Sequence, residues 1–102
     1  MKVFLNRRDG SVKAEGNYDV KSGKVVVLKG SIVSPTLKET EKFSTRTIGL
    51  LRKEHVKNYV VKDDVEFKSA TSAANFVTGS STNGLIAWKN KDGKTIKSLQ
   101  NP

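Results

Sequence analysis

The segment from Phe67 to Ile96 constrains the fold more than any other part of the chain, because it joins a well-capped helix to two turn signals. Ser69 precedes a run of small residues, and its hydroxyl oxygen can accept a hydrogen bond from a free amide in the first helical turn. Gly79 follows the run where a left-handed residue commonly ends a helix. The pattern predicts a helix from Ser69 to about Thr78. Its stripe of alanines predicts close packing against a sheet.

The first part of the chain predicts strands. Val3 to Leu5 and Val12 to Ala14 flank Asp9-Gly10, and Asp-Gly is a strong signal for a hairpin turn. Lys21 to Lys24 is a second turn, and the four aliphatic residues from Val25 to Leu28 follow it. A continuous apolar run between turn residues is typical of a strand that is buried on both faces.

A second helix is predicted from about Glu41 to Glu54, after a polar connection that contains Pro35. The residues of its apolar face would be Phe43, Thr47, Leu50 and Leu51, at spacings of four, seven and eight residues. Gly49 lies inside this helix and weakens it by about 1 kcal/mol relative to alanine.

The remaining elements are short. The composition predicts strands from Val56 to Val61 and from Leu85 to Trp88, a hairpin turn from Lys91 to Lys94, and a final strand or short helical turn from Thr95 to Leu99. Together these elements predict an α+β fold: a single domain over residues 1–102, with a small, mainly antiparallel sheet and about two helices.

Charge is the strongest indication of a partner. The chain has 102 residues and a net charge of +9, with seven Lys or Arg against three Asp or Glu in residues 1–30 and five against one in residues 67–102. The middle, residues 31–66, is nearly neutral, and no acidic residue occurs from Phe67 through Lys91. Such an asymmetry favours a polyanionic partner through counterion release. The alternative is a lysine-rich surface that serves solubility alone.

Catalytic and metal chemistry have little support. His55 is the only histidine and the chain has no cysteine, so a multi-histidine or thiolate metal site is excluded. Asp63, Asp64 and Glu66 form the one acidic cluster, which is more typical of a solvated strand end than of a metal or acid–base site. We therefore expect a protein that is not an enzyme and that needs no cofactor.

The N-terminus predicts the cellular location. The apolar run Val3 to Leu5 has only three residues, whereas a secretory signal needs roughly 7–15 and a spanning helix about 20. We expect a soluble, cytoplasmic protein with no membrane association.

A loop of short polar residues follows the alanine-rich helix. Two glycines, Gly79 and Gly84, bracket it, and its amides and hydroxyls suit it either to contact phosphates and base edges or to cap local backbone groups. Ser80, Ser81 and Asn83 are the candidate recognition residues of this loop, and Lys68, Lys89, Lys91 and Lys94, joined by Arg7 and Arg8, are the candidate phosphate contacts.

Trp88 is the only tryptophan. It could stack on a base, but a single tryptophan in a small domain is more often a core anchor with a bonded indole N–H, and we favour the core.

Several motifs resemble one bacterial family, domain of unknown function 4357. They are Phe67-x-Ser69, Ser72-Ala73-Ala74, Phe76-Val77-x-Gly79, Asn83-Gly84, Trp88-Lys89, Asp92-Gly93-Lys94-Thr95 and the upstream Val26-Val27-Leu28-x-Gly30-Ser31. The resemblance spans nearly the whole chain. Two positions depart from the family pattern: Ala70 stands where proline is frequent, and Leu85 stands where an aromatic residue usually follows Asn-Gly.

The resemblance implies an accessory role. That family stands alone or follows GIY-YIG-type nuclease domains, and it is similar to the restriction-enzyme adenine-methylase-associated domains, for which DNA recognition has been proposed. No catalytic residues are assigned to these domains. We therefore expect a non-catalytic domain that binds nucleic acid, chiefly double-stranded DNA, beside a separate nuclease or methylase. The competing hypothesis is a protein-interaction module with a basic, solubilising surface.

Overall fold

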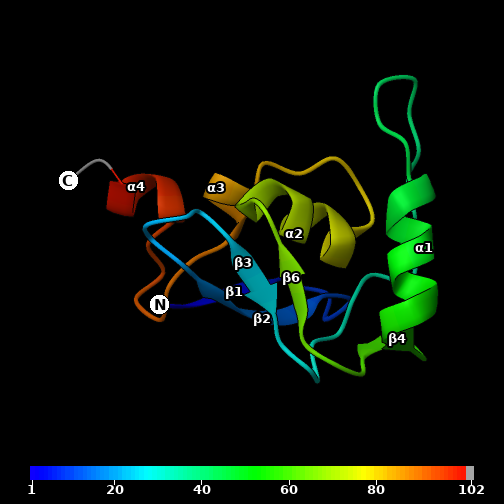
Figure 1. Cartoon of the computed structure of the whole chain (residues 1–102), viewed down its shortest axis with the longest axis horizontal. Coiled ribbons are helices and arrows are strands. Elements are labelled where there is room, and N and C mark those ends of the chain that lie inside the picture. Colours follow the sequence, from blue (N-terminus) through cyan, green and yellow to red (C-terminus); the bar gives the residue numbers. More distant parts are fainter. Residues whose placement is uncertain (101–102) are drawn as a thin grey trace.

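An antiparallel sheet of four strands is the centre of the molecule (Figure 1). The computed structural model describes residues 1–100. The strands are β1 (Lys2–Asn6), β2 (Lys13–Tyr18), β3 (Val25–Val27) and β6 (Val65–Phe67), in the spatial order β1-β2-β3-β6. Leu5 lies opposite Ala14, which confirms the predicted first hairpin. The α+β class with a mainly antiparallel sheet is confirmed as well, although β6 was not predicted.

Helix α2 (Ala70–Thr78) covers one face of this sheet, and its predicted caps are confirmed (Figure 1). The Ser69 hydroxyl oxygen accepts a bond from the backbone N–H of Ser72 at 3.1 Å. Gly79 ends the helix with a φ of 71°. A side chain at Gly79 would also collide with the carbonyl oxygen of Thr36, so glycine is needed here for both conformation and space.

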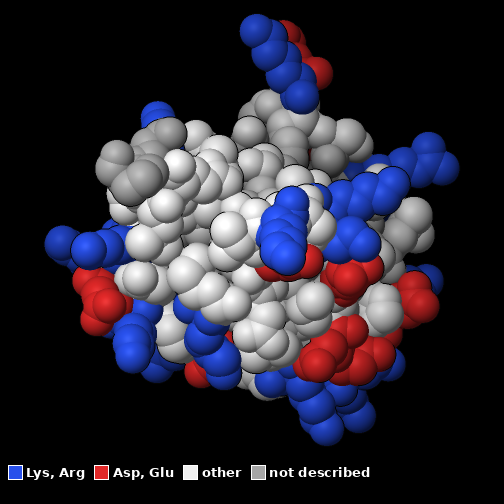
Figure 2. All heavy atoms as spheres, turned by 60° about the vertical axis from the view of Figure 1, so that its left-hand side comes forward, with Lys and Arg blue, Asp and Glu red and all other residues white. Residues whose placement is uncertain are grey.

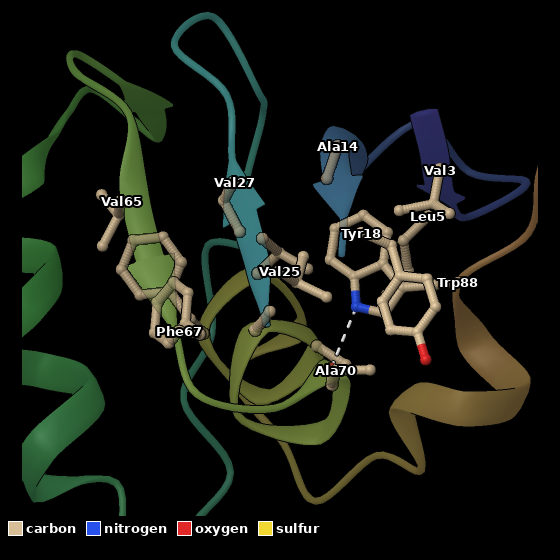
Figure 3. Packing of buried hydrophobic residues seen from close by; sticks show 14 of the residues in the cluster. Val3, Leu5, Ala14, Tyr18, Val25, Val27, Val65, Phe67, Ala70 and Trp88 are labelled. Carbon is tan, nitrogen blue, oxygen red and sulfur yellow. Dashed lines mark hydrogen bonds between the residues drawn. The ribbon is translucent and has the colours of Figure 1, made fainter. Parts of the chain in front are cut away.

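The core lies between the sheet and α2, and Trp88 is its largest fully buried side chain (Figure 3). Its indole nitrogen donates to the carbonyl oxygen of Ala70 at 3.0 Å, which confirms the core role predicted for this residue. Gly16 of β2 lies close to β3, because a Cβ at this position would be 3.1 Å from both the Val25 side chain and the carbonyl oxygen of Val26.

Among residues 1–100, no helix covers the opposite face of the sheet. Inward positions of β1 and β2 are buried and outward positions are exposed or half-buried, in strict alternation. Val26 of β3 faces outward and is half-buried. The prediction that this strand is buried on both faces is therefore wrong: an apolar run cannot show whether a second layer exists to cover it.

Helix α1 (Arg46–His55) begins later than predicted. Thr40 and Phe43 form an isolated bridge ahead of it, so the chain turns where the prediction had a first helical turn. The predicted apolar face is also wrong, because Leu50 is 62% exposed and Ile48, only 7% exposed, is the buried residue of this helix.

The predicted strand from Val56 to Val61 is a small hairpin instead. Strands β4 (Val56–Lys57) and β5 (Val60–Val61) pair with each other in a separate two-stranded sheet. Asn58 and Tyr59 join them with φ values of 52° and 64°, as a two-residue hairpin turn requires. Asparagine tolerates this left-handed conformation, which explains why the chain reverses here.

The C-terminal part contains two short helices, α3 (Gly84–Ala87) and α4 (Ile96–Gln100). The first replaces the strand predicted from Leu85 to Trp88, because the Asn83 side chain caps a helical turn by accepting from the N–H of Leu85 at 3.0 Å. A four-residue apolar run fits either conformation. Between the two helices, Lys89 bridges to Thr95 across the predicted hairpin turn.

Candidate nucleic-acid interface

The hairpin of residues 89–95 lies beside strand β1. Phe4 and Lys89 exchange both backbone bonds, with N–O distances of 2.7 and 2.9 Å. The turn itself is closed by Asn90, whose N–H donates to the carbonyl oxygen of Lys94 at 2.9 Å. The sheet is thereby extended by one bridge beyond β1, and the lysines of the hairpin are placed along its edge.

Two adjoining hollows lie at this edge. One, of about 490 Å³, is lined by Phe4, Asn6, Ala87, Lys89, Asn90, Lys91 and Gly93. The other, of about 320 Å³, is lined by Met1, Lys2, Phe4, Asn90 and Lys91. We call the six larger polar, charged and aromatic residues, namely Lys2, Phe4, Asn6, Lys89, Asn90 and Lys91, the edge surface. Phe4, Asn90 and Lys91 line both hollows, so these are two halves of one depression.

The edge surface is rich in cations. Lys2 lies 3.5 Å from Glu15, but both side chains are about half exposed, so this ion pair is weak. The other ion pairs within residues 1–100 are Lys24 with Glu66 and His55 with Glu54 and Asp63, so none involves Lys89 or Lys91. These two ammonium groups are thus available to an anionic ligand.

The side-chain amide of Asn90 uses its oxygen within the hairpin, but its NH₂ group has no partner among residues 1–100. Its carbonyl oxygen accepts the backbone N–H groups of Asp92 and Lys94, each at 3.0 Å. The side-chain NH₂ makes no hydrogen bond within residues 1–100 and is left to donate. The lysines and the NH₂ group of Asn90 are therefore hydrogen-bond donors, whereas the exposed Asn6 amide offers both donors and an acceptor.

Some of the predicted site residues come together here. Lys89, Lys91 and Lys94 share one hairpin, and Arg7 and Arg8 lie in the turn that directly follows Asn6 of β1. Because Lys89 pairs with Phe4 in antiparallel register, Lys91 and Lys94 lie toward the start of β1, whereas Arg7 and Arg8 follow its end.

The other predicted residues lie elsewhere. Lys68 precedes the first residue of α2 and Ser80 follows its C-cap, so nine helical residues, about 13 Å at 1.5 Å each, separate them. Ser81 and Asn83 continue along the loop that returns beside α2, where the N–H of Gly84 donates to the Thr71 hydroxyl at 3.1 Å. The structure does not gather all the predicted residues into a single site.

The polar loop uses much of its hydrogen-bonding capacity on itself. The N–H and the hydroxyl of Ser80 both donate to the Thr78 hydroxyl, and the N–H of Thr82 donates to the side-chain oxygen of Asn75 at 2.9 Å. The Asn83 oxygen caps α3. The capping alternative accounts for these contacts without any ligand.

Cations are spread widely over the surface. Figure 2, which brings the left-hand side of Figure 1 forward, shows Lys and Arg side chains alternating with Asp and Glu around areas without charge. The net charge of +9 therefore does not form one continuous patch on this face, and a specific contact has to rest on a local cluster.

A separate, more apolar hollow lies between α1, β6 and α2. It measures about 490 Å³, and Phe43, Ile48, Leu51 and Phe67 form its apolar walls. Lys68 and Glu66 also line it, so its charges are balanced. This groove differs in character from the edge surface.

Within residues 1–100, no group of three His, Cys, Asp or Glu side chains is placed to hold a metal ion. His55 Nδ1 lies 2.9 Å from an oxygen of Asp63, an exposed pair on the hairpin side of α1. None of the helices in this part of the chain is both long and apolar enough to cross a bilayer.

The residues of the edge surface that sequence reasoning missed are Lys2, Phe4, Asn6 and Asn90. The first three occupy alternate positions of β1, so the period of two places them together on the outward face. This alternation along β1 was a signal that the sequence offered. The pairing of β1 with Lys89 had no corresponding signal in the sequence.

The fold and the depression define a small α+β domain with one uncovered sheet face and a cationic edge. A family model described as "Domain of unknown function (DUF4357)" matches residues 4–100, and the chain belongs to this family. No curated protein and no solved structure matches the chain.

Proposed function

We propose that this domain is a non-catalytic nucleic-acid-binding module and that the edge surface contacts the phosphate backbone. One observation carries the proposal: Lys2, Lys89 and Lys91 line one depression together with the half-buried Phe4. Lysines neutralise phosphates and release condensed counterions, which gives affinity without regard to sequence. Arg7 and Arg8, which follow the other end of β1, would lengthen the contact.

The affinity of lysines for phosphates indicates a nucleic-acid partner. Phosphates occur on single and double strands alike, and double-stranded DNA is the ligand that the family resemblance favours. A role beside a separate nuclease or methylase, in DNA processing or restriction–modification, belongs to the same proposal.

Two charge-reversal variants test it. Lys89→Glu with Lys91→Glu should lower the affinity for duplex DNA at least tenfold at low salt. It should also reduce the slope of log K against log salt by about 1.8, because each phosphate contact contributes about 0.9. Fluorescence anisotropy of a labelled duplex at several salt concentrations measures both quantities.

The matched control is Lys53→Glu with Lys57→Glu, which makes the same charge change at exposed residues of α1 and β4. This variant should retain most of the affinity. Equal losses in the two variants would show that only the overall charge matters, and the edge surface would then have no special role.

The apolar hollow between α1 and α2 supports a second candidate, a protein-interaction module. Phe43, Leu51 and Phe67 give this hollow apolar walls against which the side chains of a partner would pack. Binding through this groove would depend weakly on salt and would be unaffected by Lys89→Glu with Lys91→Glu.

A further inference from the structure

Phe4 is an aromatic residue on the outward face of β1, away from the core. Val3 and Leu5 are buried in the core, whereas Phe4 faces outward and is half-buried. Its ring lines both hollows of the edge surface. The half-buried side chain thus leaves part of its surface exposed within the depression.

The groups around the ring donate hydrogen bonds. Lys89 and Lys91 are cationic, and the Asn90 amide is oriented by the two backbone groups bonded to its oxygen. Asn6 makes no side-chain bond within residues 1–100 and is exposed. A matching ligand is therefore flat, rich in acceptors and anionic, as a nucleotide is.

The acidic neighbours limit where phosphates can run. Glu15 lies directly opposite Phe4 on β2 and is also exposed on the outward face, so it disfavours a phosphate there. Lys89 and Lys91 lie on the other side of Phe4, where Asp92 is the one carboxylate of the hairpin. Phosphates are thus favoured along the hairpin and disfavoured over the middle of the sheet.

We propose that the edge surface binds an unpaired base, stacked on the ring of Phe4, with the flanking phosphates on Lys89 and Lys91; this rests on the proposed function. A base inside a duplex has both faces covered by its neighbours, so only a single-stranded or extruded base can offer a face to the ring. The larger hollow, of about 490 Å³, is within the range of small-ligand sites. On a single strand this site therefore adds stacking to the phosphate contacts that a duplex also makes.

The test compares three labelled ligands of about 12 nucleotides, namely oligothymidine, an abasic oligodeoxyribose phosphate and a duplex. The wild-type protein should bind oligothymidine more tightly than the other two. Phe4→Leu should lower the affinity for oligothymidine about tenfold and leave binding of the abasic strand unchanged. Phe4→Tyr, which keeps an aromatic face, should restore the affinity for oligothymidine.

The outcomes separate the two proposals. If Phe4→Leu weakens oligothymidine and the abasic strand equally, or neither, the stacking site is refuted while phosphate binding stands. If the wild-type protein binds none of the three ligands, both proposals are refuted. Circular dichroism spectra that match the wild type ensure that each Phe4 variant is folded, and the outward position of this residue favours that result.

Discussion

Gly84 has no side chain, and this allows two helices to pack closely against each other. A Cβ at this position would collide with the backbone carbonyl of Ala70 and with the N–H of Thr71, so α3 packs directly on the first turn of α2. Gly84→Ala should destabilise the domain by about 1–3 kcal/mol. The collision outweighs the roughly 1 kcal/mol that alanine gains in a helix. Urea unfolding followed by circular dichroism measures the change.

Gly49 is the matched control. It also lies inside a helix, but a Cβ there would make only an ordinary contact at 3.9 Å with Leu37. Gly49→Ala should therefore stabilise the domain by about 0.5–1 kcal/mol. Should both variants be stabilised, the close approach of α3 to α2 does not exist in solution.

At the scale of elements, Arg52 links α1 to the end of α2. Its guanidinium donates to the carbonyl oxygens of Phe76, Ser34 and Val77. Burial lowers the pKa of Arg52 below its usual value, yet an arginine remains charged at any ordinary pH. A positive charge there also interacts favourably with the negative end of the helix dipole.

Arg52→Met should cost about 1.5–3 kcal/mol of unfolding free energy, because the variant loses charged hydrogen bonds and leaves the carbonyl of Phe76 without this donor. Arg52→Lys should recover part of the loss, since an ammonium group cannot span three carbonyls in a fork. Thermal unfolding measures both variants, with the exposed neighbour Lys53→Met as control. A loss in Lys53→Met equal to that in Arg52→Met would contradict a specific role of the guanidinium.

The elements that the sequence predicted well are those with local signals. The first hairpin has Asp9-Gly10, and helix α2 has Ser69 and Gly79 at its ends. Elements fixed by long-range contacts were missed or misplaced. Strand β6 depends on pairing with β3, and α3 depends on the space that Gly84 leaves beside α2.

The same distinction holds for the candidate site. The lysines of the 89–95 hairpin were predicted because they share a turn, and Trp88 was correctly placed in the core. The period of two places Phe4 on the opposite face from Val3 and Leu5, but which face of the sheet α2 leaves uncovered has no local signal. Ser80 and Asn83 of the polar loop bond to nearby groups, and periodicity does not reveal such contacts.

At the scale of the whole molecule, a net charge of +9 makes acid a strong stress, because protonation of its ten carboxylates leaves nineteen Lys and Arg charges unopposed. Two of these carboxylates stabilise turns. Hydrogen bonds from Ser11 hold the pKa of Asp9 below its usual 3.8, and hydrogen bonds from Ser22 and then Lys21 do the same for the pKa of Asp19.

The sign of the pH effect follows from these shifts. A carboxylate whose folded pKa is lowered stabilises the fold above its unfolded pKa, near 3.8, and loses this contribution as the pH falls through the lower folded value. The unfolding free energy should thus decline below about pH 4, and Asp9→Asn with Asp19→Asn should decline less steeply. Urea unfolding between pH 6 and pH 2, at constant ionic strength, measures both curves.

The control variant, Glu41→Gln with Asp92→Asn, removes two carboxylates that accept no hydrogen bond within residues 1–100. The decline of its unfolding free energy should therefore match that of the wild type. If the Asp9 and Asp19 variant instead follows the wild-type curve, general charge repulsion alone governs the acid response of the domain.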